Sequence, residues 1–271
     1  MQLLISTVAI EIPQNIVATL YSIDCLPFCS YQNGKADIVI YEISLKSDIY
    51  RTMTYYLPEL HEKLKYVFRR ENCLLLSSTN FRSNCFLNLS TSNNLRCEYE
   101  LLFERLFYSI VVSKSMIRLH CSTIEDHGRG ILFLGPSGVG KTTQAERWMQ
   151  YRGSTIINGD VGLVQQTEGG FLAWGTPWHG SSPYCLNASV PVKALVVLKQ
   201  APENRLRELT GFEKVAEVSG SVFYPTWLEN GMELCAATLD RLLTDLPVYR
   251  LDNRADEAAV DLLAAELDRI S

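Results

Sequence analysis

A glycine-rich stretch in the middle of the chain has the residue types and the spacing of a phosphate-binding loop. Residues 135–142 read GPSGVGKT and satisfy the pattern G-x-x-x-x-G-K-[ST] in full. In such a loop the glycines let backbone N–H groups converge on phosphate oxygens, the lysine brings a cation to the outer phosphates, and the final hydroxyl is offered to Mg2+. An apolar run precedes the stretch and a helical pattern follows it, as this chemistry requires. The predicted nucleotide-binding residues are Gly135, Pro136, Ser137, Gly138, Val139, Gly140, Lys141, Thr142 and Thr143.

An aspartate lies where a strand beside this loop would end. Asp160 follows the apolar segment 154–159, STIING, and ligands of open α/β sheets bind at the carboxyl ends of the strands. We therefore expect Asp160 and Thr142 to hold Mg2+. A turn aspartate after Asn-Gly would give the same sequence, and that alternative stays open. The NKxD motif with which GTPases read their base is absent, and no other base-reading motif is visible, so the sequence motifs leave the choice between ATP and GTP open.

The segment around these motifs resembles a known group of kinases. RLHCSTIEDHGRGILFLGPSGVGKTTQAERW, followed by STIINGDVGLV, is similar to the HPr kinase/phosphorylase group and to the small kinases built on the phosphoenolpyruvate carboxykinase nucleotide fold. In that group a histidine lies on a strand before the loop and an aspartate follows the next strand. The matching residues here are His120 and Asp160, although a lone histidine on a strand is also an ordinary structural residue.

The resemblance implies an enzyme with Mg2+ and ATP as cofactors. Its reaction would be phosphoryl transfer to a hydroxyl, in the first place a serine, of a peptide, protein or small molecule, with peptide tailoring as one setting. Asp160 would accept or orient the hydroxyl proton, Lys141 would neutralise phosphoryl charge, and His120 would contact the terminal phosphate or the acceptor. A nucleotide-sensing binding module and a slow ATPase are the alternatives.

The chain also departs from the group. Gly159 stands beside Asp160 where the kinase/phosphorylases often carry a second acid, so the reverse, phosphorolytic reaction is left open. The additional His, Lys and Arg residues of the carboxykinases are not recognisable, and decarboxylation is not expected.

Further candidates lie downstream of Asp160. The loop 174–187, WGTPWHGSSPYCLN, is rich in Gly, Pro and Ser and is long enough to contact a substrate, with His179 and Ser181 as the leading residues. Its aromatic residues would equally form a small satellite core. Arg205, at the start of a predicted helix ENRLREL, would supply a further phosphate-binding cation, unless it is simply solvated.

Composition limits the class of protein. The chain has 271 residues, 47% of them hydrophobic, and a formal net charge of -5, without a basic stripe for nucleic acid. The most basic stretch, residues 61–70, is interpreted as an amphipathic helix. The eight cysteines are scattered without a C-x-x-C pair, and no apolar run is long enough to span a membrane. We expect a reduced, cytoplasmic protein that binds neither nucleic acid nor membrane, and a homo-oligomer is compatible with the sequence.

The predicted fold class is α/β (α+β overall). Residues 116–271 would form a C-terminal P-loop domain of the HPr kinase / phosphoenolpyruvate carboxykinase type with a mixed sheet. Residues 1–115 would form a small α+β accessory domain that recognises substrate. The expected N-terminal elements are antiparallel strands at 35–43, 72–78 and 84–90 and a helix over 100–116. The expected C-terminal elements are a hairpin around EDHGRG, a helix from 141 to Gly153, strands at 154–159, 161–166, 171–175, 192–200 and 247–251, and helices over 229–246 and 256–270.

Overall fold

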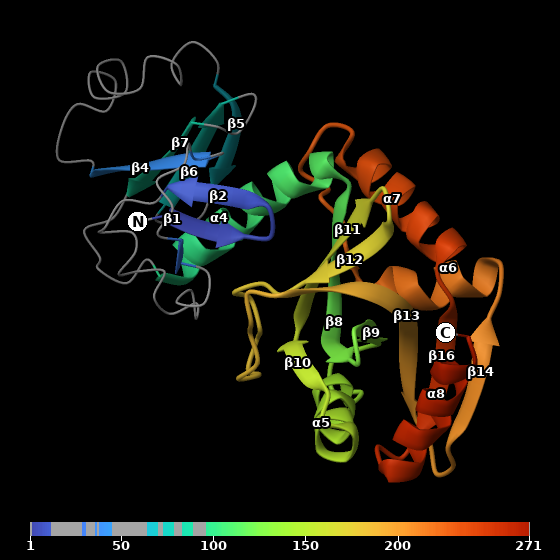
Figure 1. Cartoon of the computed structure of the whole chain (residues 1–271). Helices are drawn as coiled ribbons and strands as arrows, with labels where there is room; N and C mark the ends of the chain where they lie inside the picture. The colour runs from blue at the N-terminus through green and yellow to red at the C-terminus, as the bar shows by residue number, and fades with distance from the viewer. Residues whose placement is uncertain are drawn as a thin grey trace. The chain divides into compact units, whose positions relative to one another are not determined.

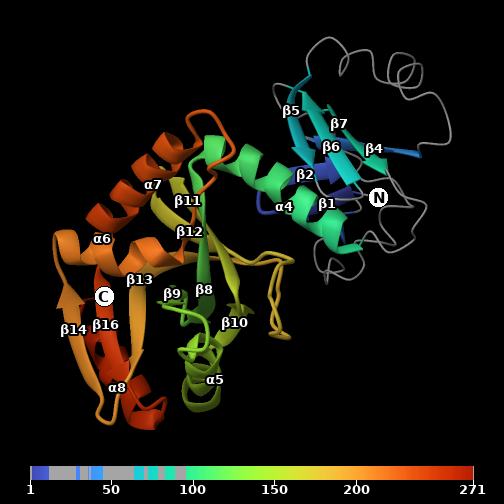
Figure 2. The same cartoon turned by 180° about the vertical axis from the view of Figure 1, so that it is seen from behind.

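The protein divides into two compact units, Met1–Val111 and Val112–Ser271, which are described separately (Figures 1 and 2). The computed structural model describes residues 2–11, 29–30, 36, 38–44, 64–69, 73–78, 83–88 and 96–270. Among these residues no helix combines the length and the apolar character that a membrane crossing requires.

The first unit contains a mixed β-sheet and one helix among its described residues. The strand order is β3-β1-β2-β4-β7-β6-β5, in which β4 pairs in parallel with β2 and β7 and the other pairs are antiparallel. The strands are β1 (Gln2–Ile5), β2 (Val8–Glu11), β3 (Cys29–Ser30), β4 (Ile38–Ser44), β5 (Leu64–Arg69), β6 (Cys73–Ser78) and β7 (Ser83–Asn88), and the helix is α4 (Arg96–Val111).

Three predictions for this unit need correction. The stretch 61–70 was predicted to be helical, but 64–69 is strand β5, antiparallel to β6. In LKYVFR the larger apolar residues alternate, and Tyr, Val and Phe favour extended backbone, which outweighs the helical pattern. The expected strands exist as β4, β6 and β7, but β4 and β7 are parallel. The α-helix ends at Val111 rather than 116: Val112–Lys114 form a 3-10 turn, and Ser115, with a φ of 56°, leaves the right-handed helical conformation.

The second unit is a mixed α/β structure built on a nine-stranded sheet with four α-helices. The pairs β9–β13 and β13–β16 are parallel, and the other pairs are antiparallel. Its strands are β8 (Met116–Asp126), β9 (Arg129–Leu134), β10 (Thr155–Asn158), β11 (Val161–Thr167), β12 (Gly170–Trp174), β13 (Ser189–Gln200), β14 (Arg205–Leu209), β15 (Val222–Phe223) and β16 (Val248–Asn253). Its helices are α5 (Lys141–Arg152), α6 (Phe212–Val218), α7 (Gly231–Asp245) and α8 (Glu257–Arg269).

Most of the predicted elements of this unit are present. The hairpin between β8 and β9 turns at His127 and Gly128, which both have positive φ, as a two-residue hairpin turn requires. Helix α5 ends at Gly153, whose φ is 70° and whose N–H donates to the Met149 carbonyl. The helix predicted at ENRLREL is wrong: residues 205–209 form strand β14, antiparallel to β16. Pairing of that short segment along the whole of β14 with the mostly buried strand β16 overrides its local pattern.

Strand β8 changes partners in the middle, and this change creates the site. His120, in its first half, pairs with Val161 of β11, whereas Cys121 pairs with Leu134, the last residue of β9. The glycine-rich loop begins after Leu134, and Asp160 immediately precedes Val161. The register therefore brings the loop and the aspartate to the same point of β8.

The core of the second unit fixes helix α5 on the sheet. Phe133 of β9 packs against Trp148 of α5, with ring centroids 6.2 Å apart, and both rings are fully buried. Helix α8 packs beside α5 and lies along β16 and β14 (Figure 1). The helix that follows the loop is therefore held on the sheet along its length. The core cluster consists of Ile124, Ile131, Phe133, Ala145, Trp148, Ile156, Ala194, Val196, Leu198, Tyr249, Leu251, Val260, Leu263, Ala264 and Leu267.

Candidate functional site

The glycine-rich loop connects Leu134 to the first residue of α5, and its backbone needs glycine. Gly135, Gly138 and Gly140 have φ of 137°, 78° and 104°, which side chains rarely allow. A Cβ at Gly138 or Gly140 would meet nothing within 4 Å, so the loop is open at these residues. On its other side Gln200 of β13 supports the loop, because its Nε2 donates to the Gly138 carbonyl at 3.3 Å.

The beginning of α5 is suited to an anion. Gly140 occupies the N-cap without a side-chain hydrogen bond, and the first turn holds no acidic residue. The first N–H groups of a helix have no partner within the helix, and the dipole favours negative charge there. Thr142 is half-buried and Thr143 is exposed in this turn. The residues therefore fit the phosphates of a nucleotide.

Lys141 spans the loop. Its buried Nζ donates to the carbonyl oxygens of Gly135, at 3.0 Å, and Pro136, at 3.3 Å. Burial lowers the pKa of the Lys141 ammonium, and the nearby Asp160 carboxylate opposes that shift. Lys141 and Asp160 therefore lie close enough for their charges to interact.

Asp160 and His120 form a pair at the turn between β10 and β11. The Nε2 atom of His120 lies 3.0 Å from Oδ1 of Asp160. The side chains are 28% and 35% exposed, so both are accessible to solvent. The Asp160 carbonyl accepts a hydrogen bond from the N–H of Cys121 at 3.0 Å, which fixes the turn against β8.

A backbone carbonyl joins the two motifs. The hydroxyls of Thr142 and Ser122 both donate to the carbonyl of Gly159, at 3.1 and 2.8 Å. Since Thr142 gives its proton to this carbonyl, its oxygen lone pairs remain for a cation. Gly159 itself has no room for a side chain, because a Cβ there would lie 1.8 Å from Oγ of Ser182. A second acid at residue 159 would not fit this arrangement.

Two of the predicted residues suit Mg2+. Among the described residues, no group of three His, Cys, Asp or Glu side chains gathers as a metal site. Mg2+ commonly takes one or two protein ligands and completes its shell with phosphate oxygens and water. The Thr142 hydroxyl and the Asp160 carboxylate, joined through Gly159, are a ligand set of that size.

The loop that follows β12 lies against Asp160. Gly180 has a φ of 60°, and a Cβ there would lie 2.7 Å from Oδ2 of Asp160. His179 contacts the carbonyl of Ser182 through Nδ1, and Ser181 is exposed. The structure thus brings the segment that holds His179 and Ser181 to the aspartate.

Arg205 has a different environment. It lies on β14, which β16 and β13 separate from β9, and its side chain is 76% exposed. It forms an ion pair with Glu203 at 2.7 Å. No contact among the described residues joins Arg205 to the glycine-rich loop, and its role as a phosphate-binding cation stays a prediction.

Sequence reasoning missed a buried cation beside His120. Arg118 lies two residues earlier on β8 and is 3% exposed. Its guanidinium lies 4.7 Å from the ring centroid of Phe223 and 5.5 Å from that of Trp178. The Phe223 ring is also 6.3 Å from the His120 ring. The spacing of Arg118 and His120, which places both on one face of a strand, was the only signal in the sequence.

Sequence reasoning also missed Asn158, the last residue of β10. Its side chain is fully buried and contacts both the backbone of Asp160 and the residues before Gly180. In the sequence it reads as part of an ordinary Asn-Gly turn.

A comparison with protein-family models assigns the chain to a family. Residues 85–243, more than half of the chain, match the family described as ScmC, SynChlorMet cassette protein ScmC, and the chain belongs to that family. A search of curated proteins finds no match.

Among solved structures, the chain is similar to the HPr(Ser) kinase/phosphatase from Coxiella burnetii. The two chains are 13% identical, and the similarity covers 56% of this chain and 93% of the other. The TM-score of 0.32 is too low to establish a common fold.

Proposed function

We propose that this protein is an ATP- and Mg2+-dependent kinase that transfers a phosphoryl group to a hydroxyl, with a nucleotide domain of the HPr kinase type. One observation carries the proposal: His120 and Asp160 form a partly exposed pair next to Gly180 and to Gly159, whose carbonyl binds Thr142 at the start of α5. A nucleotide-binding loop alone would need no such pair.

The residues have distinct roles in this proposal. Bound Mg-ATP supplies the phosphoryl group and a divalent charge. Lys141 and the N-terminus of α5 would hold the phosphates, and Thr142 with Asp160 would hold the metal ion. Asp160 also receives the proton of the acceptor hydroxyl as that oxygen bonds to phosphorus and ADP leaves with the electrons of the broken bond. His120, with its proton on Nε2, keeps the carboxylate oriented.

The acceptor follows from the same reasoning and remains a proposal. It is a hydroxyl, in the first place a serine, of a peptide, protein or small molecule. The family description names a cassette, which supports an acceptor encoded nearby. The loop with His179 and Ser181 would contact this acceptor, and the unit Met1–Val111 would help to recognise it.

The first experiment uses γ-labelled ATP and Mg2+ with host extract or with peptides encoded nearby, followed by mass spectrometry of the labelled product. We expect Asp160→Asn to lower transfer about 1000-fold, because general-base catalysis contributes up to about 10,000-fold. Binding of a fluorescent ATP analogue should be retained. Asp261→Asn, the same change on the exposed face of α8, is the control and should leave transfer unchanged.

Other outcomes would replace the proposal. Tight nucleotide binding without turnover would favour a nucleotide-sensing module. Hydrolysis without a phosphorylated product would indicate an ATPase. Full transfer by the Asp160→Asn variant would remove the carboxylate from its assigned role.

A further inference from the structure

Asn158 lies at the centre of the site and is completely buried. A buried amide must place both its donor and its acceptor atoms in hydrogen bonds, because an unpaired polar group costs about 1–3 kcal/mol. Asn158 meets this condition with partners from two segments. Its oxygen accepts hydrogen bonds from the turn that holds Asp160, and its nitrogen donates to the loop that leads to Gly180.

The oxygen of Asn158 fixes the turn. Oδ1 accepts hydrogen bonds from the N–H groups of Asp160 and Val161, both at 2.8 Å. This is the way in which an Asn side chain commonly closes a turn at the end of a strand. The N–H of Cys121 meets the Asp160 carbonyl from the other side. The backbone of Asp160 is therefore held on both sides, which determines where its carboxylate points.

The nitrogen of Asn158 holds the loop. Nδ2 donates to the carbonyl of Thr176 at 2.9 Å and lies 3.2 Å from that of Trp178. It also lies 3.3 Å from the Thr176 hydroxyl, which donates in turn to the Val161 carbonyl at 2.8 Å. The hydrogen bonds form a closed ring through Asn158, Thr176 and Val161. Two residues beyond Trp178, Gly180 lies beside the Asp160 carboxylate, since a Cβ at Gly180 would be 2.7 Å from Oδ2.

We infer that Asn158 is a positioning residue that sets the Asp160 carboxylate and the 176–180 segment in one arrangement. The acceptor-contacting loop and the base are then coupled through a single buried amide. This inference rests on the proposed kinase function for its effect on catalysis. Its structural half, the coupling of the two segments, does not depend on that function. Neither Asp nor Leu replaces Asn158, since an ionised Asp lacks the donor and Leu lacks both polar atoms.

The chain offers a matched control. Asn253, the last residue of β16, is also buried, and its Oδ1 accepts from the N–H of Ala255 at 2.8 Å. Its Nδ2 donates to the carbonyls of Lys199 and Leu251, both at 3.3 Å. Asn253→Ala therefore removes a comparable buried amide from a strand end, but one that makes no contact with Asp160.

The first test compares kinetics in Asn158→Ala, Asn158→Ser and Asn253→Ala. We expect Asn158→Ala to lower kcat for transfer from γ-labelled ATP about 100-fold, because small misplacements of reacting groups cost this much. The Kd for a fluorescent ATP analogue should stay within about twofold, since the phosphate-binding loop is untouched. A serine can still close the turn but cannot reach the loop, so Asn158→Ser should restore part of kcat. Asn253→Ala should keep the wild-type kcat.

The second test needs no activity. Hydrogen exchange of the apo protein should speed up in Asn158→Ala both at residues 160–162 and at 176–180, and in Asn158→Ser mainly at 176–180. In Asn253→Ala it should speed up only near residues 253–255. If wild-type protein transfers no phosphate, the proposed function fails while this exchange pattern still decides the coupling. An unchanged kcat in folded Asn158→Ala, uniform exchange throughout the unit, or equal losses of kcat and nucleotide affinity would overturn the inference.

Discussion

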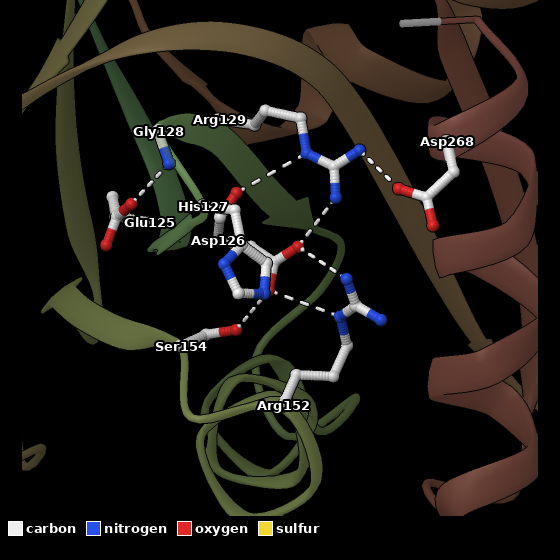
Figure 3. A network of polar contacts seen from close by, with 8 residues as sticks. All are labelled: Glu125, Asp126, His127, Gly128, Arg129, Arg152, Ser154 and Asp268. Carbon is white, nitrogen blue, oxygen red and sulfur yellow. Dashed lines mark hydrogen bonds and ion pairs between the residues drawn. The ribbon is translucent and has the colours of Figure 1, made fainter.

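Two aspartates near opposite ends of helix α5 show how differently one side chain is used. Asp126 ends β8 and is fully buried, whereas Asp160 follows β10 and is 35% exposed. Asp126 accepts hydrogen bonds from Arg129 at 2.8 Å, Arg152 at 3.1 Å and Ser154 at 2.8 Å (Figure 3). Asp160 has one side-chain partner among the hydrogen bonds described above, His120.

The difference in hydrogen bonding and exposure favours Asp160 over Asp126 as the reactive carboxylate. Both oxygens of the Asp126 carboxylate accept hydrogen bonds, from Arg129 of β9, from Arg152 of α5 and from Ser154, two residues after the end of α5 (Figure 3). Arg129 extends the network to Asp268 of α8 at 2.6 Å. A carboxylate with this many donors stabilises the fold. The side-chain hydrogen bond of Asp160 comes from His120 at Oδ1, and its Oδ2 lies beside Gly180.

The surroundings of the two aspartates also fix opposite ends of helix α5. Arg152, in its last turn, is held by Asp126, so the C-terminal end of the helix is tied to the hairpin. Thr142, in its first turn, is held through Gly159 next to Asp160. A helix fixed at its far end presents its N-terminus at a constant place, which would preorganise the proposed phosphate site.

The largest expected contrast comes from the same substitution at both residues. Asp126→Asn should lower the free energy of unfolding by about 2–3 kcal/mol, because it leaves two partly buried arginines with a neutral partner. Transfer at temperatures well below Tm should change less than twofold. Asp160→Asn should do the reverse, with the loss of transfer described above and less than about 0.5 kcal/mol in stability. Urea unfolding and transfer assays on both variants check the contrast, and a stable Asp126→Asn variant with impaired transfer would contradict it.

The next largest effect is expected in the pH dependence of stability, where acid should remove the contribution of the Asp126 network. Burial raises the pKa of Asp126, but the hydrogen bonds from Arg152, Ser154 and Arg129 outweigh it and hold the pKa below its usual value. Because the folded pKa is the lower one, the carboxylate stabilises the protein above a pH of about 4, and this contribution is lost as the pH falls through the folded pKa. The difference in unfolding free energy between wild type and Asp126→Asn should therefore shrink below a pH of about 4. A constant difference down to a pH of about 2.5 would refute this.

The parts of the site that were predictable are those written into contiguous motifs. The glycine-rich loop, the end of α5 at Gly153 and the position of Asp160 after a strand follow from local chemistry, in which glycine supplies positive φ and apolar runs form strands. The same local reasoning failed at β5 and β14. Both are short strands with interspersed charges. Pairing with β16 decides the conformation of β14, and in β5 the pairing with β6 adds to the extended preference of Tyr, Val and Phe.

The residues that sequence reasoning missed depend on distant partners. Asn158 acquires its importance from Thr176 and Trp178, and Arg118 from rings of Trp178 and Phe223. Nothing near Asn158 or Arg118 in the sequence indicates these contacts, because they exist only once the loop after β12 reaches the end of β10 and strand β15 pairs with β8. The fold creates this part of the site, and local patterns do not encode it.

Replacing one glycine in each region should have a smaller effect, which again differs between the surroundings of Asp160 and those of Asp126. Gly180, beside Asp160, and Gly153, beside the Asp126 network, both have left-handed φ, of 60° and 70°. Alanine costs about 1 kcal/mol in such a conformation at either residue. A Cβ at Gly153 meets nothing within 4 Å, whereas at Gly180 it would press on the Asp160 carboxylate from 2.7 Å.

Gly180→Ala should therefore lower transfer about tenfold by displacing the carboxylate, while Gly153→Ala should leave transfer unchanged at a similar loss of stability. Thermal unfolding and transfer rates measured side by side provide the check. Because backbone strain is common to both variants, the difference in rate reports only the contact with Asp160. Equal rates in the two variants would mean that the loop around Gly180 moves away from the carboxylate during the reaction, and that the closeness of loop and base is not needed for catalysis.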